Sequence, residues 1–117
     1  GDETFISETY VLSYLAYPGN EILLAEVEGR VTGLLSYAVR PNLYHAGEVC
    51  VIEELIVSEK ARGQGGGSAL VQELIDRAKS RGYAEISVST MPDNEQAASF
   101  YRKHGFTDEA ILLEQHL

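Results

Sequence analysis

A glycine-rich loop between a buried strand and a helix is the feature that most constrains how this chain can fold. The loop reads Arg-Gly-Gln-Gly-Gly-Gly-Ser over residues 62–68. Before it, apolar residues over 48–57 fall on both faces, as in a strand that is covered on both sides. After it, apolar residues repeat at helical spacing over 66–81, and Gly82 ends the helix. Because 84–90 alternates like a strand, these segments predict one right-handed parallel crossover unit.

The remaining patterns place further elements around this unit. They predict a helix over 7–17, an antiparallel hairpin of strands over 22–27 and 31–39, a loop over 41–47, a helix from about 92 to 104 and a final strand over 110–114. Ser7 is expected to cap the first helix, and Asp93 with Gln96 to form a capping box for the last. Gly33 inside a strand indicates a bulge. The pattern is that of a mixed α/β protein, and we expect one domain over 1–117.

Charge narrows the classes of partner. The chain has 18 acidic against 9 basic residues and a net charge of -9. Such a surface argues against binding nucleic acid or an anionic membrane, since both require basic residues. It would attract a cationic substrate, although solubility alone would also explain it.

Cysteine content and hydropathy indicate the compartment in which the protein is expected to function. Cys50 is the single cysteine, so no disulfide can form within the chain, and we expect it to be a small buried hydrophobe. No apolar run approaches the ~20 residues that span a bilayer, and the start is not that of a signal peptide. No cluster of ligands for a metal is visible. These features predict a soluble cytoplasmic protein.

The glycine loop indicates a phosphate ligand. Free amides at the start of a helix and the positive end of its dipole favour an anion, and glycines let the backbone approach it closely. No lysine precedes Ser68, which excludes a P-loop. Serine also stands where the dinucleotide fingerprint needs its third glycine.

Two segments around this loop carry a family resemblance. Arg62, Gly65 and Gly67 meet the spacing Arg-x-x-Gly-x-Gly, after IEELIV at 52–57 and before NEQAASFYRKHGF at 94–106. In this order and spacing, the segments resemble the two signatures of the GNAT-type N-acetyltransferases, over about residues 21–107. The resemblance implies a GNAT-like acyl-CoA N-acyltransferase fold, with a central mixed and mostly antiparallel sheet flanked by helices. It also implies acetyl-CoA as the cofactor and direct acetyl transfer to an amine.

The resemblance further implies which residues hold the coenzyme. Loop amides would hold its diphosphate, the edge of the preceding strand would pair with its pantetheine arm, and one face of the later helix would lie beside it. The residues expected to hold the coenzyme are Leu55, Ile56, Val57, Arg62, Gly63, Gln64, Gly65, Gly66, Gly67, Ser68, Asn94, Ala97 and Tyr101. Asn94 could equally be a residue that starts the helix.

Catalytic roles are expected for three residues. Tyr101 matches the family tyrosine that protonates the departing thiolate, and a phenol pKa near ~10 suits that transfer. Glu53 and Glu54 interrupt an apolar strand and are candidates for the base that deprotonates the amine. Strand alternation would send them to opposite faces, with Glu53 on the face of Leu55 and Val57, unless a bulge changes the parity. The base could be either carboxylate, or a chain of waters could replace it. A salt-bridged structural role for the pair is the other alternative.

The chain departs from the family pattern at its start. Only about twenty residues precede Glu21, where the family usually has a strand and one or two helices that line the acceptor site. The resemblance therefore leads us to expect that the first strand and first helix are missing from this sequence. A fragment, omitted residues, or a homodimer in which a partner supplies that wall would each explain this. The expected function is acetyl transfer to a primary amine of a small cationic molecule. A non-catalytic coenzyme-A-binding regulatory module, a protein lysine or N-terminal acetyltransferase, and a scaffold without a ligand are the alternatives.

Overall fold

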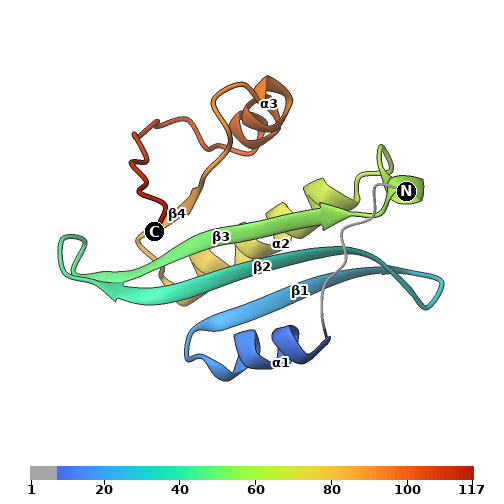
Figure 1. The fold of residues 1–117 in the computed structure, drawn as a ribbon, viewed down its shortest axis with the longest axis horizontal. Helices are drawn as coiled ribbons and strands as arrows, with labels where there is room; N and C mark the ends of the chain where they lie inside the picture. Colours follow the sequence, from blue (N-terminus) through green and yellow to red (C-terminus); the bar gives the residue numbers. More distant parts are fainter. Residues whose placement is uncertain (1–7) are drawn as a thin grey trace.

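The computed structural model describes residues 8–117 and contains one four-stranded sheet with a helix on each face (Figure 1). Its elements are α1 (Glu8–Ala16), β1 (Asn20–Val27), β2 (Arg30–Asn42), β3 (Gly47–Val57), the short 3-10 helix η1 (Glu59–Ala61), α2 (Gly66–Arg81), β4 (Glu85–Val88) and α3 (Glu95–Lys103). The strand order is β1-β2-β3-β4, antiparallel as far as β3 and parallel between β3 and β4. The mixed α/β architecture and the parallel crossover unit are therefore confirmed.

Helix α2 has the bounds that its sequence predicts, because a glycine in the left-handed region stands at each end. Gly65 precedes it with φ 83°, and Gly82 follows it with φ 73°. The Gly82 amide donates to the carbonyls of Ala78 and Lys79, which closes the last turn. The helix buries one apolar face against the sheet: Leu70, Val71, Leu74 and Ala78. This packing fixes the helix start, and with it the glycine loop, relative to β3.

The core lies between α2 and the sheet. Leu35, Tyr37 and Cys50 are fully buried there, beside the α2 side chains. Burial raises the pKa of the Cys50 thiol to about 11, so the thiol stays protonated near neutral pH. Cys50 is thus the small buried hydrophobe that the sequence predicts.

The β1–β2 hairpin is longer than its apolar runs, and it contains a bulge. Pairing shifts between Ala25 and Glu26, beside the partner position of Gly33, as the glycine in that strand predicts. A Cβ on Gly33 would lie 3.1 Å from Leu70 Cδ1 and 3.3 Å from the Ile56 carbonyl oxygen. The glycine therefore also lets α2 approach the sheet closely.

The observed cap of α3 differs from the predicted one. Asn94, not Asp93, is the N-cap of α3, because its Oδ1 accepts a hydrogen bond of 3.0 Å from the Ala97 amide. The capping box predicted for Asp93 and Gln96 is wrong by one position. Ser7, the expected cap of the first helix, lies outside the described residues.

The strand predicted over 110–114 is not formed. Residues 106–117 carry no regular secondary structure, and Ile111, Leu112 and Leu113 are exposed. Apolar residues can suggest a strand, but a strand also needs a neighbour for its backbone groups. Among residues 8–117, β4 pairs with β3 alone and no strand pairs with this segment. Within the same range, no helix is long and apolar enough to cross a bilayer.

The Asn94 cap gives a stability prediction. Asn94→Ala should lower the free energy of unfolding by about 1 kcal/mol, because the Ala97 amide loses its acceptor. Asp93→Ala, one residue earlier, should change it by less than about 0.5 kcal/mol. Urea denaturation of both variants measures this difference. A larger loss for Asp93→Ala would contradict the assignment of the cap.

Candidate active site

The glycine loop presents amides at the start of α2 for which residues 8–117 supply no backbone partner outside the helix. Ala69 is the first residue bonded into the helix, through its amide to the Gly65 carbonyl at 2.9 Å. The amides of Gly66, Gly67 and Ser68 precede it in the first turn, where a helix offers no carbonyl partners. They lie at the positive end of a helix of 16 residues. This end of α2 can therefore bind an anion through its backbone.

The loop glycines keep the space above these amides open. Gly63 and Gly65 have φ of 84° and 83°, a region that side chains rarely adopt, and a Cβ on either would meet nothing within 4 Å. Gly67 differs, because a Cβ there would lie 3.6 Å from the Phe100 ring of α3. Two glycines thus leave room for a ligand, and the third borders α3.

Helix α3 supports the loop from the side. His104 Nε2 lies 3.1 Å from the Ser68 hydroxyl, and the His104 ring packs on Phe100 at 4.9 Å between centroids. The Ser68 side chain is therefore turned toward α3, which leaves its backbone amide for an anion. His104 therefore acts as a structural contact between α3 and the start of α2.

The edge of β3 that faces β4 is open at its carboxyl end. The β3–β4 ladder has four residue pairs, from Val49 with Glu85 to Ile52 with Val88. Beyond Ile52, β3 continues to Val57 while β4 has ended. The two strands therefore separate where the expected pantetheine-binding residues begin.

Backbone groups on this edge point away from β2. The Ser58 amide donates to the Thr32 carbonyl at 2.8 Å, so residues of that parity face β2 and residues Leu55 and Val57 face the open edge. Arg62 Nε donates to the Val57 carbonyl at 3.2 Å, which agrees with this direction. The amide and carbonyl of Leu55 are thus placed to pair with an added extended chain.

A bulge in β3 decides where the two glutamates lie. Ser36 pairs with Glu54 and Tyr37 with Ile52, which leaves Glu53 as the extra residue. Ile52 and Leu55 both pack into the core on the α2 side, although they are three residues apart. The expectation that Glu53 and Glu54 point to opposite faces is therefore wrong, because the bulge breaks the alternation. Both carboxylates lie on the α1 face.

Tyr14 of α1 joins the glutamates there. Its hydroxyl donates a hydrogen bond of 2.8 Å to Glu53 Oε1. Burial, this hydrogen bond and the negative charges of Glu53 and, to a smaller extent, Glu54 raise the pKa of Tyr14, so its phenol stays a donor. Both glutamates are exposed, so neither carboxylate incurs the burial cost that an acid within a strand suggests.

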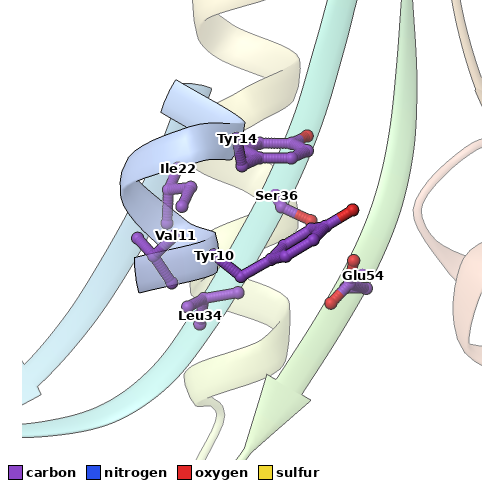
Figure 2. A pocket seen from close by; sticks show the side chains of 7 residues that line it. All are labelled: Tyr10, Val11, Tyr14, Ile22, Leu34, Ser36 and Glu54. Carbon is purple, nitrogen blue, oxygen red and sulfur yellow. The ribbon is translucent and has the colours of Figure 1, made fainter. Parts of the chain in front are cut away.

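A small pocket lies between α1 and the sheet beside these carboxylates (Figure 2). Its volume is about 70 Å³, and its lining residues are Tyr10, Val11, Tyr14, Ile22, Leu34, Ser36 and Glu54. Sequence reasoning missed Tyr10, Tyr14 and Ser36 as site residues. The i,i+4 spacing of the tyrosines was the available signal, since it places both on one helix face.

Tyr101 lies on the other side of the sheet. It is buried in the core beside α2, with edge-to-face contacts to Phe100 and Phe106 at 5.1 and 5.5 Å. Burial raises the pKa of Tyr101, so its phenol keeps its proton near neutral pH. The candidate acid and the candidate bases are therefore on opposite faces of β3.

The remaining candidates lie at this end of the sheet, whereas the loop predicted over 41–47 lies at the opposite end. Ala97 is half-buried in the first turn of α3, and the side chain of Asn94 is engaged in the cap. Gln64 bonds through its side chain to the Lys60 carbonyl at 3.3 Å. His45 lies 3.2 Å from Glu85, at the start of β4 and far along β3 from the glycine loop. The loop containing His45 therefore does not join the site.

Comparison with known proteins agrees with this geometry. The sequence matches the family described as "Acetyltransferase (GNAT) family" over residues 2–106. The chain belongs to this family. The expected GNAT resemblance is confirmed.

The GNAT relatives of this chain carry descriptions of different functions. The chain is 30% identical over 115 residues to L-2,4-diaminobutyric acid acetyltransferase of Nocardia farcinica, covering 98% of this chain and 58% of that protein. It is 29% identical to glucosamine 6-phosphate N-acetyltransferase 1 of rice, Oryza sativa subsp. japonica, covering 85% and 61%. A crystal structure described as a transcriptional regulator from Bacillus halodurans C-125 superposes with a TM-score of 0.84 and 31% identity, covering 93% and 73%. This chain thus spans about three fifths of the length of these two curated relatives.

The site fits the acetyl-CoA that a GNAT protein is expected to use. Open space above Gly63 and Gly65 and the unpaired first-turn amides suit a diphosphate. The free β3 edge at Leu55 and Val57 suits an arm that carries amide groups. Both features lie at the same end of the sheet, as one elongated ligand requires.

Gly65 gives a direct test of the diphosphate site. Gly65→Val should lower coenzyme A affinity by tenfold or more, because its side chain would enter the open space above the loop. Gly82→Val is the matched control, since Gly82 also has positive φ and open space but lies at the far end of α2. Both variants should lose about 1–2 kcal/mol of stability from backbone strain. Calorimetry and thermal unfolding measure the two effects, and equal coenzyme affinity in the two variants would contradict the assignment.

Proposed function

We propose that this protein transfers the acetyl group of acetyl-CoA to the primary amine of a small cationic acceptor. One observation carries the proposal: unpaired amides at the start of α2 and the unpaired edge of β3 meet at the same end of the sheet. A helix start alone suits many anions. The adjoining strand edge adds a binding surface for an extended arm with its own amides.

The chain's residues would share the work as follows. Amides of the loop and of the first turn of α2 hold the diphosphate, and Leu55 and Val57 orient the arm along β3. When bound, acetyl-CoA supplies the acetyl group as a thioester. A carboxylate of the Glu53–Glu54 pair takes the proton that the amine must lose. Tyr101 holds a proton at its hydroxyl for the departing sulfur.

Two observations support a small cationic amine as the acceptor. Two exposed carboxylates lie together on the α1 face, within a chain of net charge -9, so a cation is attracted. The relative from Nocardia farcinica is named for an amino acid that carries two amines. Protein lysines and N-termini are the wider alternative acceptors.

A non-catalytic coenzyme-A-binding module is the second candidate. It is favoured by the solved relative described as a transcriptional regulator. Calorimetry with acetyl-CoA should give binding under either candidate, whereas a scaffold without a ligand gives none. A thiol-release assay over linear diamines, amino sugars and lysine peptides then separates an enzyme from a module. Binding without release for every amine would favour the module.

Tyr101 gives a prediction specific to catalysis. Tyr101→Phe removes the hydroxyl and keeps the ring contacts with Phe100 and Phe106. Turnover should fall by about a hundredfold, the lower end of the general acid range, while coenzyme affinity stays within about twofold. Thiol release and calorimetry on the same preparation measure the two quantities. Unchanged turnover would remove Tyr101 from the acid role.

A further inference from the structure

We propose that the pocket between α1 and the sheet receives the ammonium end of a linear aliphatic amine, held by Glu54, while Glu53 anchors α1 through Tyr14. The role of this pocket in acetyl transfer rests on the proposed function. The inference goes further in naming the acceptor class and in giving the two glutamates different tasks. Four features of the pocket support it.

The first feature is a buried oxygen that accepts no hydrogen bond. Ser36 is only 4% exposed, and its hydroxyl interacts with the Tyr14 phenol as a donor but accepts no hydrogen bond within the described part of the chain. It lines the pocket from the sheet side (Figure 2). A buried oxygen that accepts no hydrogen bond is unfavourable, and a ligand with N–H groups would donate to it.

The second feature is the charge of the lining. Glu54 is the one charged residue among the seven lining side chains, and none of them is basic. The rings of Tyr10 and Tyr14 extend from α1 over the same space (Figure 2). Aromatic faces beside a carboxylate favour a cation over a neutral or anionic group.

The third feature is the tie between Tyr14 and Glu53. The Tyr14 hydroxyl occupies Glu53 Oε1 at 2.8 Å, and this bond links α1 to the bulge in β3. Glu54 instead lines the pocket itself. The structure thus engages one carboxylate in holding the pocket wall and leaves the other to face an acceptor.

The fourth feature is size. A volume of about 70 Å³ has room for an ammonium and one or two methylenes. A sugar ring would have to extend beyond this volume. Ile22 and Leu34 supply apolar contacts for the methylenes. The acceptor class is therefore a linear alkylamine rather than an amino sugar.

Calorimetric titration with 1,3-diaminopropane and with glucosamine, each in the presence of coenzyme A so that no transfer occurs, tests this inference. The diamine should bind the unchanged protein at least tenfold more tightly than glucosamine. Glu54→Gln should weaken diamine binding by tenfold or more. Glu48→Gln, the same charge change at the other end of β3, should leave it within twofold. Equal binding of both amines, no diamine binding, or equal effects of the two substitutions would overturn the inference.

Two further variants separate ligand contact from structural support. Ser36→Ala should weaken diamine binding at least threefold with little change in the melting temperature, because it removes a buried oxygen that accepts no hydrogen bond within the described residues. Glu53→Gln should instead reduce hydrogen-exchange protection of α1, with a smaller loss of diamine affinity than Glu54→Gln. A larger affinity loss for Glu53→Gln would reverse the assigned roles and overturn the division.

Failure of the proposed function has a different signature. It would appear as no heat of coenzyme A binding when no amine is present. Failure of the pocket inference would appear as intact coenzyme binding with diamine affinity that is absent or insensitive to Glu54. Diamine binding that depends on Glu54 without coenzyme binding would support the pocket and reject the enzyme.

Discussion

The separation of β3 from β4 after Ile52 and Val88 is the constraint on which the rest of the site depends. Up to that pair, the two strands satisfy each other's backbone groups. Beyond it, β3 continues without β4, so the backbone groups of Leu55 and the amide of Val57 face an open edge, while the Val57 carbonyl accepts from Arg62 Nε. An unpaired strand edge can form hydrogen bonds with an extended ligand. The start of α2 supplies an anion site at the end of that edge.

The bulge at Glu53 is the second feature of β3 that shapes the site. An ordinary strand would place one glutamate in the core beside α2, where an unpaired carboxylate is costly. The extra residue turns both carboxylates to the α1 face and keeps Ile52 and Leu55 in the core. The sheet thereby separates the groups by chemistry: a protonated Tyr101 on one face and two carboxylates on the other. A ligand on the open β3 edge lies between these two faces.

Local signals predicted most of the fold. Glycines before and after α2 set its bounds, because positive φ at Gly65 and Gly82 is a local property of the backbone. Pairing register is not local, which is why the bulge at Glu53 was foreseen only as an exception to strand alternation. The sequence predicts Asp93 rather than Asn94 as the cap of α3, because adjacent polar residues give nearly the same signal. The apolar segment 110–114 was assigned to a strand because sequence cannot tell whether a neighbouring strand is there to pair with it.

The predicted site residues and the pocket residues differ in how far apart they lie in the sequence. The glycine loop and the β3 edge are continuous segments, so a local pattern was enough to propose their residues. The pocket residues Tyr14, Ser36 and Glu54 come from three separate elements, and only folding brings them together. Ser36 in particular reads as an ordinary polar residue of a strand, since its burial depends on α1 lying over it.

Amide chemical shifts followed by NMR during titration with coenzyme A test the central claim most directly, because they report each backbone group separately. The largest changes should fall on the loop and first-turn amides over 63–68 and on Leu55 and Val57 of the open edge. Absence of change at these amides, or changes confined to the β1 edge around Leu24, would contradict a diphosphate at the start of α2 and an arm along β3.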